Sequence, residues 1–296
     1  MSLRLEMLQV ARLAPRALGE SAALVGGFLR SQLGGNGGFC DREGKSDLYY
    51  TVFGIEGLLA LKAEVPYTRI DPYLRSFGNG DDLDLVHLAC LARAWAAFPR
   101  GWPRPVCPEA IAARVEAHRA ADGGYHAQPD AKRGSLYGGF LAIGAYQDLG
   151  LPLPEPDRLA DSIEQLRASD GGYANDSEMP IGLTPPTAAA VVLLRQLDRT
   201  PDAAIGRWLL DRCRPSGGFF ATPLAPVPDL LSTATALHAL AALHVDFQAV
   251  AESCLDFVDS LWTNRGGFFG TWEDDALDCE YTYYGLLALG HLAHLA

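Results

Sequence analysis

Three aspartates at positions 81, 82 and 84 are the first residues in this chain whose types and spacing could do chemistry. Carboxylates that lie close together repel one another, so the pKa of one rises and it can keep a proton to donate. The competing interpretation is that Asp82 is the N-cap of a helix and that its neighbours are solvated. We take Asp82 and Asp84 as candidate catalytic acids.

A second acidic cluster follows the DDxxD pattern at Asp274, Asp275 and Asp278. Carboxylate oxygens are ligands that Mg²⁺ accepts, so a magnesium site is one interpretation of this spacing. The segment before Asp278 reads as a loop that leads into a helix, which favours an N-cap for this residue. Asp278 and Asp229, which begins the preceding apolar segment, complete the candidate catalytic acids.

Aromatic residues gather in what we expect to be the first turns of apolar helices. For at least half of them simple core packing is expected, and the others would line an apolar tunnel suited to an isoprenoid chain or a carbocation. His87 and His238 are expected in the core or the cavity wall and not as catalysts. The aromatic residues are Tyr49, Tyr50, Phe53, Tyr137, Phe140, Tyr281, Tyr283 and Tyr284.

The elements that position these residues recur along the chain. Five glycine pairs are each followed by an aromatic residue, and their second glycines stand at positions 38, 124, 172, 218 and 267. The first gap holds two repeats, because its missing marker falls at Phe77-Gly78-Asn79-Gly80. Six repeats of about 45 residues indicate a solenoid or a closed array. The pairs themselves are expected to be turns that need positive φ.

Each repeat pairs a helix with charges on one side and a helix that is apolar on every side. The amphipathic helices face water and precede the glycine pairs, at 22–33, 108–121, 156–168, 202–212 and 247–262. The apolar helices must be enclosed, at 47–63, 82–98, 136–149, 184–197, 229–243 and 278–295. Two layers of helices predict an all-α fold, a closed α/α toroid of about six helical hairpins that forms one domain over residues 1–296.

Side-chain oxygens at the starts of the inner helices are expected N-caps, at Asp47, Asp82, Thr184, Asp229 and Asp278. Because the inner helices run in the same sense, their N-termini gather at one end of the barrel. The site is therefore expected at that end, where side chains converge on a central cavity.

With these repeats in view, the sequence resembles the protein prenyltransferase β-subunits and, more distantly, the terpene cyclases that share their α/α toroid. The matching unit is Gly-Gly-Phe, a spacer and Asp-x-x-x-Thr-x-x-x-Leu, present at Asp229 and Asp278, and at Asp47 with isoleucine in the last position. The order of the segments is most similar to the Rab geranylgeranyltransferase β-subunit. The resemblance implies an isoprenoid or other apolar small molecule in the cavity, and a helical α-subunit as a partner.

The family's zinc site is degenerate in this sequence. Zinc there binds an Asp, a Cys two residues later and a His just before the threonine of the next repeat. Asp229 takes the first place, but Leu231 and Tyr281 stand at the other two. Neither side chain replaces a thiolate or an imidazole, so zinc is not expected. A displaced site that uses Cys279 with Asp229 is the remaining alternative.

The basic residues with which the family binds a prenyl diphosphate are also missing from their usual positions. The family places basic residues three and six positions ahead of the zinc Asp, and here those positions are Pro226 and Pro223. Lys132 and Arg133 are the best remaining candidates for the diphosphate, with a plain surface charge as the alternative interpretation. Among the terpene cyclases, protonating enzymes use an Asp-x-Asp-Asp acid and ionising synthases bind magnesium diphosphate with DDxxD, which gives the two acidic clusters a role by resemblance.

Composition limits the partners and the cellular location that we expect for this protein. The net charge of −12 argues against nucleic acid as a partner, because phosphate-backbone binding needs clustered Lys and Arg. No apolar run reaches the length of a membrane span, and the N-terminus lacks a signal-peptide core, so we expect a cytoplasmic protein. The six cysteines have no CxxC spacing and are expected to be free thiols.

The sequence therefore predicts a toroid that binds an isoprenoid, prenyl diphosphate-type substrate in its central cavity without the zinc of the family. The first hypothesis is a prenyltransferase or terpene cyclase in which Tyr50, Tyr137, Tyr281 and Tyr284 contact the substrate. The alternative is a non-catalytic toroid that binds a lipid or a protein partner.

Overall fold

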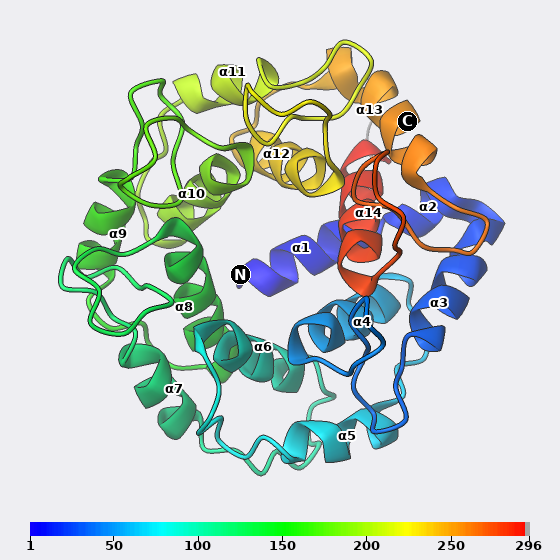
Figure 1. The fold of residues 1–296 in the computed structure, drawn as a ribbon, viewed down its shortest axis with the longest axis vertical. Helices are drawn as coiled ribbons and strands as arrows, with labels where there is room; N and C mark the ends of the chain where they lie inside the picture. Colours follow the sequence, from blue (N-terminus) through cyan, green and yellow to red (C-terminus); the bar gives the residue numbers. More distant parts are fainter. Residues whose placement is uncertain (294–296) are drawn as a thin grey trace.

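The computed structural model describes residues 1–293 and has the shape of a closed ring of helices (Figure 1). Within these residues six helices form the inner layer: α4 (Leu48–Ala60), α6 (Leu85–Ala96), α8 (Leu136–Leu149), α10 (Thr184–Gln196), α12 (Leu230–Ala242) and α14 (Cys279–Leu292). Six more form the outer layer: α3 (Ala22–Ser31), α5 (Tyr67–Arg75), α7 (Pro108–Glu116), α9 (Pro156–Glu164), α11 (Ala204–Leu210) and α13 (Gln248–Leu261).

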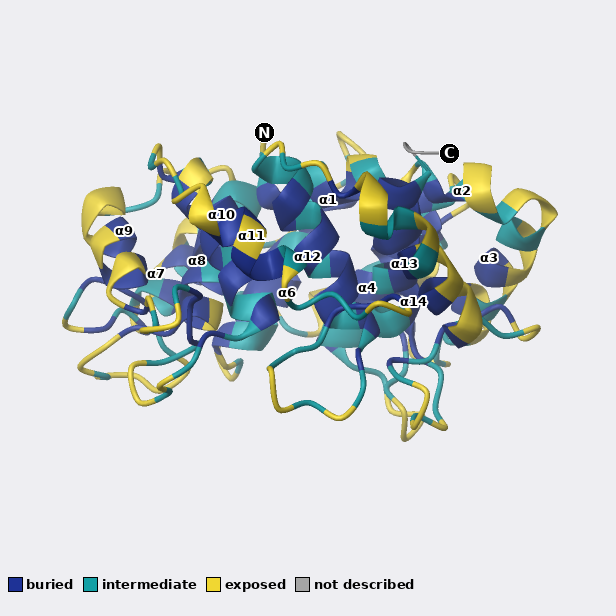
Figure 2. Cartoon of the chain, turned by 90° about the horizontal axis from the view of Figure 1, so that it is seen from above, coloured by how far each residue is buried: buried dark blue, intermediate teal, exposed yellow. Residues whose placement is uncertain are grey.

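The ring closes because α14 packs against both α12 and α4. Each outer helix packs on the inner helix that follows it, so every repeat is one hairpin of the α/α toroid. The side view in Figure 2 shows the inner layer buried and the loops hanging from one face. The all-α toroid of six hairpins that the sequence predicts is confirmed.

The N-terminal segment fills one end of the ring. It comprises α1 (Leu3–Ala11), α2 (Ala14–Leu18) and the 3₁₀ turn η1 (Gly19–Ser21). Helix α1 runs into the centre of the ring in Figure 1 and packs against α14, α4 and α8. Figure 2 places it toward the face opposite the loops. The central hollow is therefore open at the loop face and has a floor made by α1.

The repeated Gly-Gly-aromatic and Asp-x-x-x-Thr motifs are joined by one hydrogen bond. The backbone N–H of Phe219 donates to Thr233 Oγ1 at 2.9 Å, and Thr233 in turn donates to the carbonyl of Asp229 at 2.7 Å. The same bond joins Phe39 to Thr51 and Tyr173 to Thr187. The threonine thus satisfies a buried amide and ties each loop to its inner helix.

The glycine pairs are turns, as expected. The first glycine of the pairs has a positive φ, for example 96° at Gly37 and 91° at Gly217. At Gly217 a Cβ would lie 1.7 Å from the carbonyl oxygen of Ser253, so the turn also packs too closely on α13 for a side chain. These pairs are architectural and do not form a phosphate loop.

Several expected helix boundaries are wrong by a few residues. The N-cap of α6 is Asp84 and not Asp82, because Asp84 accepts the N–H of His87 at 2.9 Å. Thr184 is the first residue of α10 and gives no side-chain cap, since its hydroxyl donates to the carbonyl of Phe220 instead. Outer helix α5 was not expected, and the predicted end of the last helix at 294–295 lies outside the described residues.

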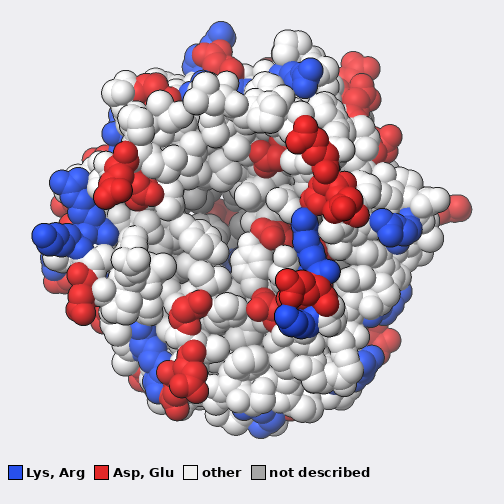
Figure 3. Space-filling view, viewed as in Figure 1, with Lys and Arg blue, Asp and Glu red and all other residues white. Residues whose placement is uncertain are grey.

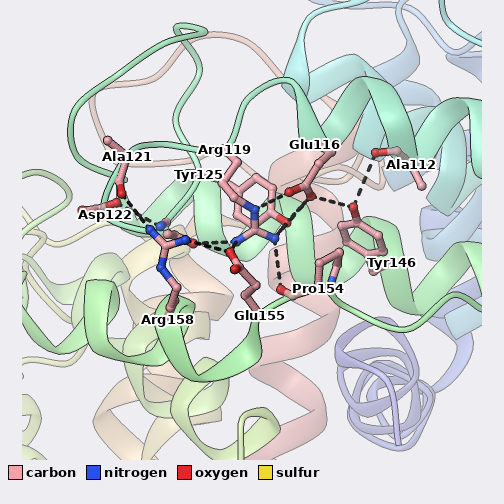
Figure 4. Close-up of polar contacts among 12 residues, drawn as sticks. Ala112, Glu116, Arg119, Ala121, Asp122, Tyr125, Tyr146, Pro154, Glu155 and Arg158 are labelled. Atoms are coloured by element: carbon pink, nitrogen blue, oxygen red, sulfur yellow. Dashed lines mark hydrogen bonds and ion pairs between the residues drawn. The ribbon is translucent and has the colours of Figure 1, made fainter.

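A polar cluster joins the two layers at the third hairpin (Figure 4). Glu116 on outer helix α7 accepts hydrogen bonds from the hydroxyls of Tyr125 at 2.9 Å and Tyr146 at 2.8 Å. Arg119 pairs with Glu116 and stacks over the ring of Tyr125 at 4.5 Å. Because these charged and phenolic groups satisfy one another, they hold α7 and α8 together, and none of the four lines the central cavity.

Candidate active site

The central hollow contains a cavity of about 430 Å³ above the floor helix α1. Figure 3 shows the molecule hollowed at the centre of the ring on the loop face, with white residues along most of the edge and Asp, Glu and basic residues gathered on its right-hand side. Within the described part of the chain its lining includes no lysine or arginine. It consists of Leu3, Met7, Tyr49, Leu136, Tyr137, Phe140, Asn175, Pro185, Pro186, Ala188, Ala189, Val192, Leu231, Thr235, His238, Glu280, Tyr284 and Leu287.

Glu280 is the one acidic residue in that lining, and it lies in the first turn of α14. Burial raises the pKa of its carboxyl to about 7, against a hydrogen bond that lowers it. That bond comes from the Tyr49 hydroxyl on α4, which donates to Oε1 at 2.5 Å. The carboxyl can therefore hold a proton near neutral pH, inside a largely apolar cavity.

Aromatic rings surround Glu280 on three helices. Tyr49 and Phe53 lie edge to face on α4 with ring centroids 4.9 Å apart, and Tyr284 lies 5.6 Å from Phe53. Tyr137 and Phe140 come from α8. The negative faces of such rings stabilise positive charge that develops nearby. This arc of the wall is suited to a cation formed next to the acid.

The opposite arc of the wall is aliphatic. Helix α10 contributes Pro185, Pro186, Ala188, Ala189 and Val192, and α12 contributes Leu231, Thr235 and His238. Burial lowers the pKa of His238 to about 4, so its ring is neutral near pH 7. The sequence places His238 in the core or cavity wall, and the structure has it in the wall.

Two of the predicted catalytic acids are engaged as helix caps. Asp229 Oδ1 accepts the N–H of Ser232 at 2.7 Å and Oδ2 accepts its hydroxyl at 2.7 Å. Asp278 accepts the N–H of Tyr281 at 2.8 Å. Burial raises the pKa of both carboxyls, but neither lines the cavity. Both catalytic assignments stay predictions, and each carboxylate has a structural partner.

The other two predicted acids, Asp82 and Asp84, lie on the rim at the start of α6, where both are exposed. His87 lies between Asp84 and Asp47, with ring nitrogens 2.8 Å and 3.2 Å from their carboxylate oxygens. These contacts raise the pKa of His87 to about 9. Asp84 therefore joins an ion-pair cluster that braces two helix N-termini, and Asp82 lies in the loop before it.

The DDxxD aspartates meet an arginine. Arg42, from the first repeat, pairs with Asp274 at 2.8 Å and with Asp278 at 2.7 Å, and its guanidinium lies over the ring of Tyr281 at 5.4 Å. A magnesium ion at these carboxylates would have to displace that guanidinium. Within residues 1–293, no group of three or more His, Cys, Asp or Glu side chains is placed to hold a metal ion.

The residues at the family's zinc positions do not fit zinc. Asp229 caps α12, Leu231 lies in the cavity wall, and Tyr281 packs under Arg42. Cys279 is fully buried behind the rim and burial raises the pKa of its thiol, which opposes the thiolate that zinc needs. We derive no step through zinc.

The predicted substrate contacts divide into two groups. Tyr137 and Tyr284 line the cavity, whereas Tyr50 and Tyr281 lie on the rim outside its lining. Lys132 and Arg133 are exposed in the loop before α8 and are not part of the lining. Their assignment to a diphosphate remains a prediction, since neither side chain lines the cavity that residues 1–293 enclose.

Glu280 and the floor helix were missed by reasoning from sequence. A signal for Glu280 existed, because a charged residue in a helix that is otherwise apolar on every side must have a partner or a function. Glu56, Arg93 and Asp148 carry the same signal in α4, α6 and α8. Nothing in the repeat pattern places α1 inside the ring.

Comparisons with known proteins agree with this geometry. The family model described as the prenyltransferase alpha-alpha toroid domain matches residues 17–90, 108–220 and 186–295, which is most of the chain. The protein belongs to this family. Among curated proteins, none matches the sequence at a significant level.

Solved structures of the type II terpene cyclase MstE from Scytonema are similar in fold. A complex with merosterolic acid A (product) is 15% identical with a TM-score of 0.62, covering 96% of this chain and 99% of that chain. A complex with geranylgeranyl dihydroxybenzoate (substrate) is 16% identical with a TM-score of 0.60, covering 95% and 98%. At these identities the likeness concerns the fold. Within the described residues no helix is long and apolar enough to cross a membrane.

Proposed function

We propose that this protein is an enzyme that cyclises an isoprenoid polyene by protonating it, with Glu280 as the acid. The observation that supports this most is a carboxyl whose pKa is about 7 in a largely apolar cavity of about 430 Å³. A general acid is most effective when its pKa lies near the working pH, because the proton is then both present and transferable. The similarity in fold to a type II terpene cyclase agrees with this proposal.

The reaction needs three things from the chain. Glu280 transfers its proton to one carbon of an alkene, and the alkene π electrons form the new C–H bond. The cation left on the other carbon lies among the rings of Tyr49, Tyr284 and Phe140, which stabilise it while a second alkene attacks. The cyclised cation then loses a proton to solvent water from a carbon next to the cationic centre, and the electrons of that C–H bond form the new alkene. Solvent reprotonates the Glu280 carboxylate, so the net reaction is isomerisation of the substrate.

Exclusion of water is the third requirement, because water would capture the cation as an alcohol. Helix α1 closes the floor of the cavity with Leu3 and Met7. A lining without lysine or arginine also offers no compensating charge for a diphosphate, which makes a protonated alkene a better match than an ionised diphosphate. A helical partner subunit stays a prediction of the family resemblance.

The test is conversion of acyclic C15 and C20 polyenes in D₂O by the purified chain. We expect cyclic products of unchanged formula that carry one solvent deuterium each. Glu280→Gln should lower the rate about 100-fold or more, because general acids contribute about 10² to 10⁴. Glu273→Gln, an exposed carboxylate on the neighbouring loop, is the matched control and should leave the rate unchanged.

Release of diphosphate from a prenyl diphosphate without deuterium uptake would contradict the proposal. Tight binding of the polyenes with no conversion would instead favour the non-catalytic, lipid-binding toroid.

A further inference from the structure

A small chamber of about 80 Å³ lies beside the main cavity, between α1, α4, α6 and α8. The two spaces are direct neighbours, because Leu3, Met7, Tyr49, Tyr137, Phe140 and Tyr284 line both. The chamber differs in having a charged corner, made by Arg4, Arg93 and Asp148. The proposed cyclisation does not use this corner.

The corner is built from two ion pairs that cross between helices. Arg93 on α6 donates to both carboxylate oxygens of Glu56 on α4, with Nε at 2.8 Å from Oε1. Arg4 on α1 donates from Nε to Asp148 on α8 at 3.0 Å, and from Nη2 to the carbonyl of Ala96 at 3.3 Å. The side chains of Glu56 and Asp148 are only 1% and 4% exposed, so both carboxylates are buried with an arginine as counter-charge.

The two guanidinium groups keep donors to spare. Each has five N–H donors in a fixed fork, and in the described part of the chain neither Nη1 atom makes a hydrogen bond. The side chains of Arg4 and Arg93 are 11% and 17% exposed, although both lie inside the ring. Both side chains line the chamber, so the corner can offer N–H donors to whatever occupies it.

The charges of the corner already balance, two arginines against two carboxylates. An added anion would therefore be buried without a counter-charge of its own, which is costly. An uncharged oxygen that accepts a hydrogen bond carries no such cost and would satisfy the spare donors. The chamber has roughly the liquid volume of two to three waters, which suits a hydroxyl or carbonyl group.

The corner lies deeper in the ring than the acid. Glu280 is two residues past the N-cap Asp278, and Arg93 is nine residues past the N-cap Asp84. With the inner helices side by side and a rise of about 1.5 Å per residue, the difference corresponds to roughly 10 Å of depth. An extended chain held by its oxygen in the chamber would therefore present a distant alkene to Glu280.

We propose that this chamber is a head-group subsite for an isoprenoid with an uncharged oxygen function, such as an alcohol or a ketone. The inference deepens the proposed function, on which its account of substrate orientation rests. It excludes a diphosphate as the group bound at the floor.

Binding of one C15 chain with different ends tests the proposal through displacement of a fluorescent apolar probe from the cavity. We expect farnesol and farnesal to bind about tenfold more tightly than the matching hydrocarbon, since one net hydrogen bond is gained. Equal affinity for the hydrocarbon, or tightest binding of farnesyl diphosphate or farnesoate, would overturn the proposal. This series uses the unaltered chain and is decisive alone.

A double substitution then tests whether the charged corner causes the preference for oxygenated ligands. Arg4→Met with Asp148→Asn removes both charges together, which avoids leaving one of them buried and unpaired. We expect the preference for the oxygenated ligands to fall to less than about threefold. Arg12→Met is the matched control, because Arg12 also ties α1 to the ring, through the carbonyl of Leu59, but lies outside the chamber. Retention of the full preference both in the Arg4→Met, Asp148→Asn variant and in the matching pair Arg93→Met with Glu56→Gln would refute the subsite.

The two proposals fail separately. If Glu280→Gln abolishes cyclisation but ligands show no head-group preference, the function stands and the subsite is wrong. If the preference exists and depends on Arg4 and Asp148 while Glu280→Gln has no effect on conversion, the subsite stands and the acid is wrong.

Discussion

The two arcs of the cavity wall have different chemistry although both come from the same repeat. The arc of α14, α4 and α8 brings Glu280 together with tyrosine and phenylalanine rings, whereas the arc of α10 and α12 presents mainly alanine, proline, valine and leucine. The repeat fixes where each inner helix starts and which of its residues are buried. The difference teaches that this ring keeps one architecture and varies only the side chains that face the hollow.

The arc that contains Glu280 is expected to make the folding stability of the protein fall as pH rises. This is the largest change in unfolding free energy that we predict. Burial raises the pKa of Glu280 from 4.5 to about 7, so the folded chain holds a proton that the unfolded chain has lost. The stabilisation is present below about pH 4.5 and is lost as pH rises through 7, by up to about 3 kcal/mol. Urea unfolding of the wild type and Glu280→Gln across pH 4 to 8 measures it. Parallel stability curves would show that this carboxyl is not perturbed.

The aromatic rings should matter to turnover more than the aliphatic wall does. Tyr284→Leu removes a π face next to the acid, and we expect the cyclisation rate to fall about tenfold to thirtyfold, because a desolvated cation–π contact is worth roughly 2 kcal/mol. Leu231→Met on the opposite arc conserves volume and should change the rate less than about threefold. The two rates are measured with the same polyene, and similar losses in both variants would erase the distinction between the arcs.

The smallest effects separate architecture from cavity wall within one helix. Thr233→Val leaves the buried N–H of Phe219 without an acceptor and should cost about 1 to 2 kcal/mol in unfolding free energy. Thr235 faces the cavity and donates to carbonyls of its own helix, those of Leu231 and Ser232, so Thr235→Val should cost about 0.5 kcal/mol or less. Chemical denaturation of both variants gives the two numbers. Equal costs would mean that the threonine of the repeat is not a tie between loop and helix.

The ring could be predicted from sequence because its determinants are local and repeated. Glycine pairs need a positive φ, aspartates cap the inner helices, and helices apolar on every side must be enclosed. The predicted start of α6 was wrong because two aspartates could cap this helix. Asp82 was expected as the N-cap, and the structure uses the side chain of Asp84. Helix α5 escaped because Pro72 interrupts its pattern and few apolar residues mark it.

The site was only partly predictable. The sequence directed attention to the rim, where Tyr137 and Tyr284 do line the cavity, and to Asp229 and Asp278, which the structure uses as caps. Glu280 was passed over because its significance depends on Tyr49, which lies 231 residues away in the chain. Motif matching favours clusters of aspartates, but an acid that keeps its proton needs an apolar enclosure more than it needs acidic neighbours.

The amino-acid sequence alone determined the repeat, the two helical layers and the end of the barrel where the inner helices begin. Those features follow from hydrogen bonding, φ preference and apolar periodicity within about 45 residues of chain. Only the tertiary structure decided that α1 closes the floor of the cavity and that Arg42 forms ion pairs with two of the DDxxD carboxylates. It also decided that Glu280 faces the apolar cavity. Each of these depends on closure of the ring, which brings the first and last repeats into contact.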